Sequence, residues 1–599
     1  MKKKVLAILL TVALFTGVCA LPAQAAGLPP AVTDAVPGAV HAVLGVLADT
    51  AQDVKDFASL PLATQFSGRG FFIAVDALIT RLIQTILTAV ETLVPAARSH
   101  EPIDGYTNEH FLPGDSKFED QQGVFSLGYD SRSIMPADFG SKAYRMGGYD
   151  FNKTATESIF SAGLAEGAED YLKVRTIVLD DGTGRGAMAF AVLDVIGLAN
   201  GNVRAIRAKL SDLVDDGTLS SINVAVTHSH SAIDSQGLWG NDLLQLIPNN
   251  IAAAFLPGLV QPMQGIDQTF LQTMVDQTAD SIRAATAQRQ EGTLYFAKEN
   301  IKDHLRDVID PYVMDENLYR LRFVPDATQY SNARATVIAS FSAHPERVGL
   351  ITDDNPGNVV SADFIPYIEQ VIQEEGDANF LFVQGPIGAR ISAGLGPAEG
   401  LEGLNRLQGT QKYGQTIGRL LLDMQNEEVV APTLNIAHKE VLVEVKNPLL
   451  KAVGKLWLAD NKMINDKKAG KTYTLTEVGY LELGSQVKVL LQPGETSPEL
   501  LLGGSNLSKN GSASGKDYPL SPLRDTIPDL MIFDLVNDSI GYIIPDSDST
   551  NFLMRYIDGQ LTDTGSLTAN LNDALLLTFS TTIASVMQHA FLDLVDVVR

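Results

Sequence analysis

Two histidines separated by one residue form the most chemically suggestive pattern in the chain. His228 and His230 directly follow the apolar stretch 224–226, in which the alternation of residue types is typical of a strand. Because side chains repeat every second residue along a strand, both imidazoles are expected on one face. Imidazole is a frequent zinc ligand, and only nine histidines occur in the 599 residues. The pattern therefore indicates a zinc site that supports metal-assisted hydrolysis.

Further residues of suitable chemistry stand at the ends of other predicted strands. His344 follows the alternating apolar stretch 336–341, and Glu495 follows a strand predicted to end at Leu491. Tyr542 and Tyr556 lie in short polar segments nearer the C-terminus. Taken singly, a buried histidine is more often structural than a ligand, and the two tyrosines are explained by packing. Only their combination raises the expectation of a shared site.

The N-terminus predicts export. Lysines at positions 2–4 precede an apolar run over 5–18, and an Ala-x-Ala motif ends at Ala25, so residues 1–25 are expected to be a signal peptide. A secreted or extracytoplasmic protein follows, with lipid anchoring at Cys19 as the minor alternative because Val18 replaces the usual small residue. Since Cys19 is the only cysteine, the mature chain has no thiolate ligand, and histidine, carboxylate or tyrosine must hold any metal.

Composition narrows the class of partner. The formal net charge is −26, and it becomes −29 when the three signal lysines leave without any acidic residue. Such a charge repels phosphate backbones, so nucleic acid is excluded as a partner. With 45% hydrophobic residues the chain is able to bury large cores and form more than one structural unit. No obligate protein partner is indicated.

The domain organisation follows from shifts in composition. Residues 26–98 carry apolar residues at helical spacing and predict an amphipathic helical segment, either packed on the body or serving as a device for transient membrane-surface contact. Residues 99–123 are polar and rich in Pro and Gly, as in a linker. The main domain is expected over 124–599. Within it, the apolar run 238–264 predicts either a hydrophobic lip beside the site or a buried helical hairpin.

Alternating segments predict a mixed α/β (α+β) main domain. The expected strands cover 174–179, 187–193, 441–445 and 486–491, and the expected helices cover 205–213, 364–373 and 576–598.

The order of the motifs resembles the neutral ceramidase family of zinc-dependent amidases. That family carries, in sequence, Thr-His-x-His-Ser, His-Pro, Gly-Asp-x-Ser-Pro, Pro-Gly-Glu-Phe-Thr, Asn-x-Tyr-x-x-Tyr and Arg-Tyr-Glu. The matching segments of this chain contain His228 and His230, His344-Pro345, Gly385 to Ser392, Pro493 to Thr496, Tyr542 and Arg555-Tyr556. Together with 128–130 and 146–149, the likeness extends from about Val124 to Gly559.

The resemblance implies a set of roles. It makes His228, His344, Glu495 and Tyr542 the ligands of Zn²⁺, and it makes His230, Tyr556 and Ser392 the catalytic residues. The implied activity is cleavage of the N-acyl amide bond of ceramide or a related N-acyl lipid, a step in sphingolipid metabolism. About forty residues follow Tyr556, whereas an immunoglobulin-like sandwich needs ≈ 100, so no such C-terminal domain is expected.

Departures from the family pattern keep two alternatives open. The segment 388–393 lacks the Asp and Pro of the family loop, and Ser539 replaces the first tyrosine of its motif. The family's basic segment corresponds to residues 300–302 or to Arg306. These changes are compatible with an esterase or amidase for another acylated substrate, or with a lipid-binding relative without catalysis. Other zinc hydrolase patterns are absent, because residue 232 is Ala and no His-Glu-x-x-His occurs.

Overall fold

The fold is that of a computed structural model. It describes residues 96–97, 100–107, 109–114, 117–148, 164–239, 243–307, 312–348, 359–388, 391–393, 404–466, 468–512, 516–549 and 578–599. The predicted signal peptide, nearly all of the predicted helical segment 26–98, and Tyr556 lie outside these residues.

Over the described residues the larger sheet has nine strands, in the order β14-β12-β11-β9-β2-β5-β6-β7 with β16 on β9. Only the pairs β12–β14 and β6–β7 are parallel, and they stand at opposite ends of the order. The strands are β2 (Ser126–Ser133), β5 (Lys173–Asp180), β6 (Ala187–Leu193), β7 (Leu219–Val226), β9 (Gln290–Asn300), β11 (Asn317–Pro325), β12 (Ala335–Phe341), β14 (Ala378–Gln384) and β16 (Glu428–Val429).

Alternation along these strands separates two cores. In β6, Ala189 and Ala191 face the helices, whereas Phe190 and Val192 face a second sheet. Both faces of the strand are therefore buried, as the unbroken apolar sequence of 187–193 requires. The helix-side core is covered by α5 (Asn200–Ala208), α8 (Gln268–Ala287), α9 (Ile365–Glu374) and α10 (Arg406–Asp423).

Two of these helices begin at clear capping residues. The Asp267 side chain accepts hydrogen bonds from the first turn of α8, and Asn405 forms a capping box with Gln408 at the start of α10. Each cap satisfies backbone N–H groups that a helix leaves without partners.

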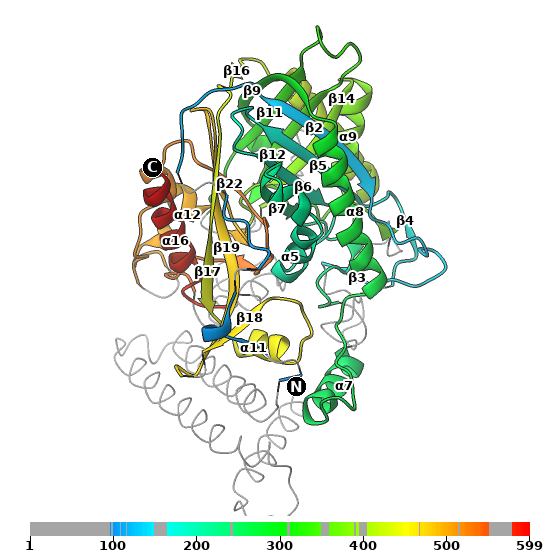
Figure 1. Cartoon of the computed structure of the whole chain (residues 1–599), viewed down its shortest axis with the longest axis vertical. Helices are drawn as coiled ribbons and strands as arrows, with labels where there is room; N and C mark the ends of the chain where they lie inside the picture. The colour runs from blue at the N-terminus through cyan, green and yellow to red at the C-terminus, as the bar shows by residue number, and fades with distance from the viewer. Residues whose placement is uncertain are drawn as a thin grey trace, which may run out of the picture.

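The smaller sheet has the order β1-β18-β19-β20-β22, with β17 on β19. Helix α16 (Ile583–Val598) packs on its outer face, so the layers run helix, sheet, sheet, helix (Figure 1). The strands are β1 (Glu101–Pro102), β17 (Leu434–Glu444), β18 (Met463–Asp466), β19 (Lys471–Leu483), β20 (Val487–Leu491) and β22 (Met531–Phe533).

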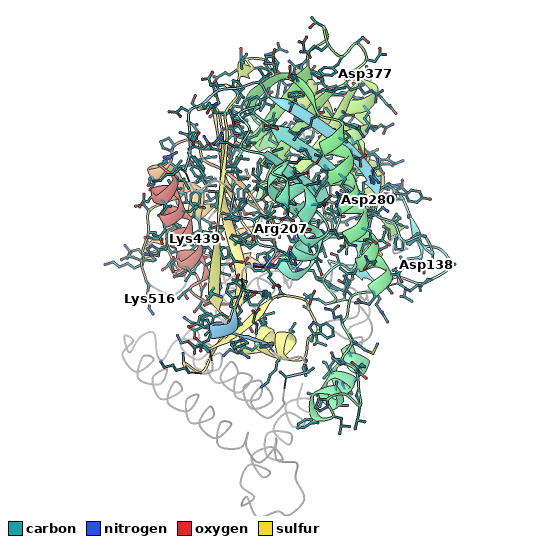
Figure 2. The ribbon with its side chains drawn as sticks, in the orientation of Figure 1. Asp138, Arg207, Asp280, Asp377, Lys439 and Lys516 are labelled. Atoms are coloured by element: carbon teal, nitrogen blue, oxygen red, sulfur yellow. The ribbon has the colours of Figure 1, made fainter. Side chains whose placement is uncertain are left out.

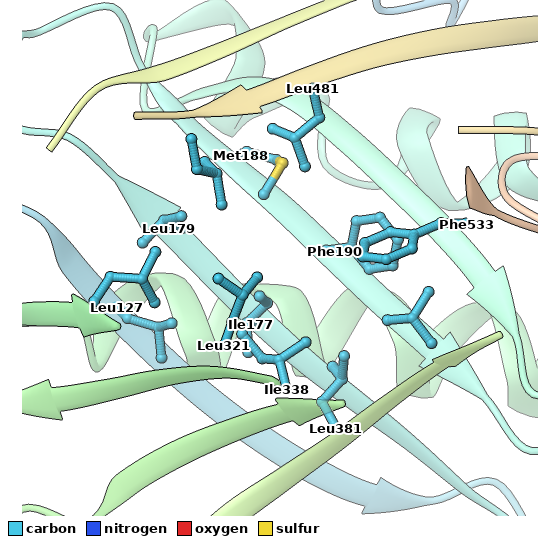
Figure 3. A pocket seen from close by; sticks show the side chains of 13 residues that line it. Leu127, Ile177, Leu179, Met188, Phe190, Leu321, Ile338, Leu381, Leu481 and Phe533 are labelled. Carbon is cyan, nitrogen blue, oxygen red and sulfur yellow. The ribbon is translucent and has the colours of Figure 1, made fainter. Parts of the chain in front are cut away.

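The inner faces of the two sheets meet in a wholly apolar layer. A cavity of about 20 Å³ remains there, lined by side chains of both sheets such as Met188, Leu481 and Phe533 (Figure 3). A water molecule in a cavity needs polar partners, and this cavity offers none. It is therefore a small packing gap and not a ligand site.

The remaining elements are short, apart from α7. They are η1 (Ile103–Gly105), β3 (Met146–Gly147), β4 (Gly167–Ala168), α6 (Ser211–Asp215), β8 (Ala232–Ile233), α7 (Leu243–Phe255), η2 (Lys302–His304), β10 (Leu305–Asp307), β13 (Val359–Val360), β15 (Ile391–Ala393), α11 (Pro448–Lys455), β21 (Glu495–Thr496), α12 (Glu499–Leu502), η4 (Ser505–Leu507), α13 (Leu523–Thr526) and β23 (Tyr542–Ile543).

The predicted mixed α/β class is confirmed, and most expected elements are present. The predicted strand 187–193 coincides with β6, whereas the helix expected over 205–213 is divided between α5 and α6. The hairpin predicted for 238–264 is wrong: α7 is a single helix containing Pro248, and a loop follows it in which Leu259 is 83% exposed. A turn containing Pro257 and Gly258 ends the helical pattern there, because proline and glycine both disfavour helix. None of the described helices has the length and apolar character needed to cross a bilayer.

The predicted linker 99–123 packs along the smaller sheet over its described residues. Strand β1 pairs with β18, Gly114 forms a bridge with Ala437, and the ring of Phe118 stacks on that of Tyr480. The described part of this segment therefore belongs to the smaller sheet and its surface.

Candidate active site

Three pairs of parallel strands direct their carboxyl ends to one region. These pairs are β6–β7, β12–β14 and β20–β22, and the loops that follow them hydrogen-bond to one another. The bonds include Ser229 N to Val195 O, His230 N to Pro345 O, Asp534 N to Gln384 O, Gly388 N to Thr496 O and Glu495 N to Gly541 O. Carboxyl ends of parallel strands are the usual place for a site in such sheets, because the connecting loops meet there.

His228 and His344 are held in matching ways. The Nδ1 atom of His228 lies 2.6 Å from Ile196 O, and that of His344 lies 2.8 Å from Ile391 O. A carbonyl oxygen only accepts, so each Nδ1 donates a hydrogen bond to it and each Nε2 is the ring nitrogen left to face the site. This is the arrangement that second-sphere hydrogen bonds impose on metal-binding imidazoles. His228 also has a φ of +66°, in the left-handed region that residues other than glycine seldom adopt.

The Nε2 atoms of His228 and His344 both approach one buried carboxylate, that of Glu495. The Oε2 atom of Glu495 lies 3.4 Å from His228 Nε2 and 3.3 Å from His344 Nε2. Among the described residues, the ion-pair partners of Glu495 are these two imidazoles, and neither lysine nor arginine pairs with it. Burial opposes ionisation of Glu495, but the two imidazoles outweigh it and hold its pKa well below the ordinary value.

Burial also disfavours protonation of His344, yet the carboxylates of Glu495 and Glu346 outweigh that effect and raise its pKa. The Glu495 carboxylate is therefore ionised, and among the described residues its ion-pair partners are imidazoles. Such a carboxylate is suited to binding a cation.

His230 completes a group of three imidazoles. Its ring centroid is 4.7 Å from that of His228 and 5.6 Å from that of His344, and one ring nitrogen from each of the three lies within 4.8 Å of the others. Burial, reinforced by the other two imidazoles, lowers the pKa of His230 well below its ordinary value. Gly148 (φ +115°) supports this ring closely, because a Cβ atom there would lie 2.6 Å from His230 Cα.

Tyr542 stands beside Glu495. Strands β21 and β23 are parallel, and Glu495 is the register partner of Tyr542. Paired residues of adjacent strands project from the same face about 5 Å apart, so Tyr542 and Glu495 start from neighbouring positions on one face. Tyr542 is 8% exposed.

Comparisons with known proteins identify the fold. No family model and no curated protein matches the sequence. Among solved structures, the neutral ceramidase from Pseudomonas aeruginosa superimposes with a TM-score of 0.52 at 15% identity, over 79% of this chain and 74% of the other. A structure of a ceramidase complexed with C2 gives 0.51 at 14% identity, over 79% and 75%. The chain has the neutral-ceramidase fold.

Within this neutral-ceramidase fold, the predicted residues separate into three groups. His228, His344 and Glu495 come together, with Tyr542 and His230 adjacent to them. Ser392 forms a backbone bridge with His344, but its hydroxyl donates to the carboxylate of Glu346.

The remaining candidates are less informative. Tyr556 lies outside the described residues. Of the two basic candidates, Arg306 is exposed opposite Ser392, and Lys302 pairs with Glu316 at the surface.

Sequence reasoning missed Asp534 and Glu346. Asp534 follows the apolar strand β22 and is fully buried beside Glu495. A charged residue directly after a short apolar run was the available signal, although many such residues cap turns at the surface. Glu346 lies two residues beyond His344, next to the His-Pro motif.

The donor set fits a zinc ion. Zinc bonds of 2.0–2.2 Å in tetrahedral geometry place neighbouring donor atoms about 3.3–3.6 Å apart. The separations of 3.3 and 3.4 Å between the imidazole nitrogens and Glu495 agree with that spacing. Nitrogen and oxygen donors with fixed second-sphere partners are also the ligands that zinc commonly takes in catalytic sites.

Proposed function

We propose that the chain is a zinc-dependent amidohydrolase that cleaves the N-acyl amide bond of ceramide or a related N-acyl lipid, releasing a fatty acid and an amine. The observation that carries the proposal is the approach of two fixed imidazole nitrogens, 3.3 and 3.4 Å away, to one oxygen of the buried Glu495. The neutral-ceramidase fold supports it, and the cluster lies where the loops of this chain hydrogen-bond to one another.

His228, His344, Glu495 and Tyr542 would hold the ion. Zinc bound there supplies Lewis-acid polarisation of a carbonyl and lowers the pKa of water to about 7. The His228 and His344 rings are already oriented by backbone carbonyls, so little ordering of these two side chains is required when the site fills.

His230 is suited to moving the proton. Its ring lies against the rings of His228 and His344, so a nitrogen of His230 is close enough to the proposed metal position to accept a proton from the attacking water. The same nitrogen then returns the proton to the departing amine. We assign oxyanion stabilisation to Tyr556 and substrate contact to Ser392, which adjoins His344 through the backbone.

The composition of the chain beyond the His228 loop suits an enzyme for a lipid-like substrate outside the cytoplasm. From Leu243 to Ile266 the chain contains no charged residue, in a protein of net charge −26. This uncharged segment follows the His228 loop in the sequence. We propose that the exported enzyme makes transient contact with a membrane surface through it.

The test combines metal content with turnover. Wild type, His228→Ala and His344→Ala are purified, their zinc per chain is measured, and release of fatty acid from ceramide is followed before and after chelation. His589→Ala is the matched control, because this exposed histidine on α16 is far from the site in the sequence and the fold.

We expect stoichiometric zinc and turnover in the wild type and control, and loss of both in the two site variants. Short N-acyl and ester substrates are assayed in parallel. A folded wild-type chain that neither binds zinc nor hydrolyses any of them would refute the proposal, and a strong ester preference would replace the amidase with an esterase.

A further inference from the structure

A second buried acidic residue, Asp534, binds the backbone next to Glu495. Asp534 follows β22 and is 0% exposed. Its Oδ2 atom accepts hydrogen bonds from Thr496 N at 2.8 Å and from Ile387 N at 3.1 Å, and its own N–H donates to Gln384 O at 2.9 Å. One side chain thus joins the loops that follow β14, β20 and β22.

These contacts fix two backbone segments beside the site, one at Thr496 and one at Ile387. Thr496 follows Glu495, so the bond to its N–H sets the orientation of the peptide plane that carries the Glu495 carbonyl. Ile387 precedes Gly388, whose N–H donates to Thr496 O at 2.9 Å. Gly388 packs so closely that an added Cβ would lie 2.2 Å from Glu495 O. The loop after β14 is therefore locked onto the Glu495 strand through Asp534.

Among the described residues, no lysine, arginine or histidine forms an ion pair with Asp534, and the charged group that acts on it is the like-charged Glu495. Burying a carboxylate without such a partner is costly unless its hydrogen bonds are required. The two backbone N–H groups are the partners that the structure provides.

Resting on the proposed function, we propose that Asp534 is a positioning residue that fixes Glu495 toward the metal through hydrogen bonds to Thr496 and Ile387. The role requires a hydrogen-bond acceptor oxygen at the position of Asp534 Oδ2. It does not require the negative charge, because the donors are neutral amides.

The experiment compares Asp534→Ala, which removes the acceptor, with Asp534→Asn, which keeps one. Zinc affinity is measured by competition with a chelator, the coordination geometry by the visible absorption of the cobalt-substituted protein, and turnover as separate kcat and KM. Asp181→Ala is the control, because Asp181 is also buried and accepts the backbone N–H of Leu434, but at the opposite end of β5 from the site.

For Asp534→Ala we expect zinc affinity to fall about 10–100-fold, with an altered cobalt spectrum, a lower kcat and an almost unchanged KM. Asp534→Asn should remain within a few-fold of wild type in zinc affinity, since its carbonyl oxygen accepts both N–H groups. Asp181→Ala should lower the melting temperature without changing zinc affinity or the cobalt spectrum.

Wild-type affinity and spectrum in Asp534→Ala would overturn the inference. Equal impairment of Asp534→Asn and Asp534→Ala would also overturn it, because the charge would then be the requirement. If Asp534→Ala does not fold, Asp534→Asn decides alone: near-wild-type zinc affinity supports the inference and loss as large as in His344→Ala refutes it. Failure of the wild type to bind zinc would instead refute the proposed function itself.

Discussion

At the residue scale, the site depends on which nitrogen of each imidazole is available. The backbone carbonyls of Ile196 and Ile391 accept hydrogen bonds from the Nδ1 atoms of His228 and His344. Both Nε2 atoms therefore point at Glu495. His230 differs, because its ring packs edge-on against the other two imidazoles. The three imidazoles form a metal-capable group by distance alone, so ligand and proton carrier must be separated by experiment.

Substitution of His230 and of Tyr542 distinguishes the two roles. We expect His230→Ala to lower kcat about 10²–10⁴-fold while zinc content stays near one per chain, because a general base is lost and not a ligand. Tyr542→Phe should weaken zinc binding about tenfold. Zinc per chain, competition titration and kcat provide the measurements. Loss of zinc in His230→Ala would make His230 a ligand in place of Tyr542.

At the element scale, the site exists because parallel strand pairs end together. The pairs β6–β7 and β12–β14 occupy opposite ends of the larger sheet, yet β14 also contacts β5, β6 and β7, so the sheet is strongly curved. The buried Arg175 of β5 stabilises this approach by binding Asp194, after β6, and Glu369 on α9. The smaller sheet adds β20 and β22, whose loops bring Glu495 and Tyr542.

The contact between the loop after β14 and the Glu495 strand predicts a sensitive glycine. Gly388→Ala places a Cβ atom against backbone that has no room to yield, so the Glu495 strand must move. We expect zinc affinity to fall at least tenfold and the melting temperature to drop. Gly167→Ala is the control, since nothing lies within 4 Å of its added Cβ. Unchanged zinc affinity in Gly388→Ala would contradict this account of the loop.

At the scale of the whole molecule, the two sheets are joined by an apolar layer and by a buried polar cluster at its edge. Arg207 of α5 binds Glu477 of β19 through two hydrogen bonds of 2.9 and 2.7 Å, in the interior of the molecule (Figure 2). His438 of β17 lies beside this pair and contacts Ser221 of β7 at 3.1 Å. A buried pair of this kind is costly to break, so it holds the sheets in one arrangement.

This cluster predicts a pH dependence of stability. Burial lowers the pKa of His438 to about 4, from 6.5 in the unfolded chain. The unfolded state therefore binds the proton first on acidification, so the contribution of neutral His438 is complete above pH 6.5 and is lost as the pH falls toward 4. Between pH 7.5 and 5 the loss amounts to about 2 kcal/mol.

Urea unfolding of the wild type and of His438→Gln at both pH values measures this term, because other groups titrate in both proteins. We expect the difference between their free energies of unfolding to shrink by about that amount at pH 5. A difference that is independent of pH would show that His438 is not buried in its neutral form.

Local patterns in the sequence predicted most of the elements, and the ordered motifs predicted the fold. The apolar run 187–193 predicted β6 to the residue, and the resemblance of the ordered motifs predicted the neutral-ceramidase fold that the structural comparisons support. They also placed His228, His344 and Glu495 at strand ends. Side-chain periodicity reports only which way a residue faces within its own segment, so predictions of this kind succeed where burial is set locally.

Only the tertiary structure decided which of those strand ends meet. The contact between His344 and Glu495 spans 151 residues, and the carbonyls that orient the imidazoles come from other loops. Asp534 and Gly388 carry no motif of their own, because their importance lies in long-range contacts with the Glu495 backbone. The same limit explains why α7 is a single helix where a hairpin was one of the two expectations. Apolar composition alone does not determine which surface covers a segment.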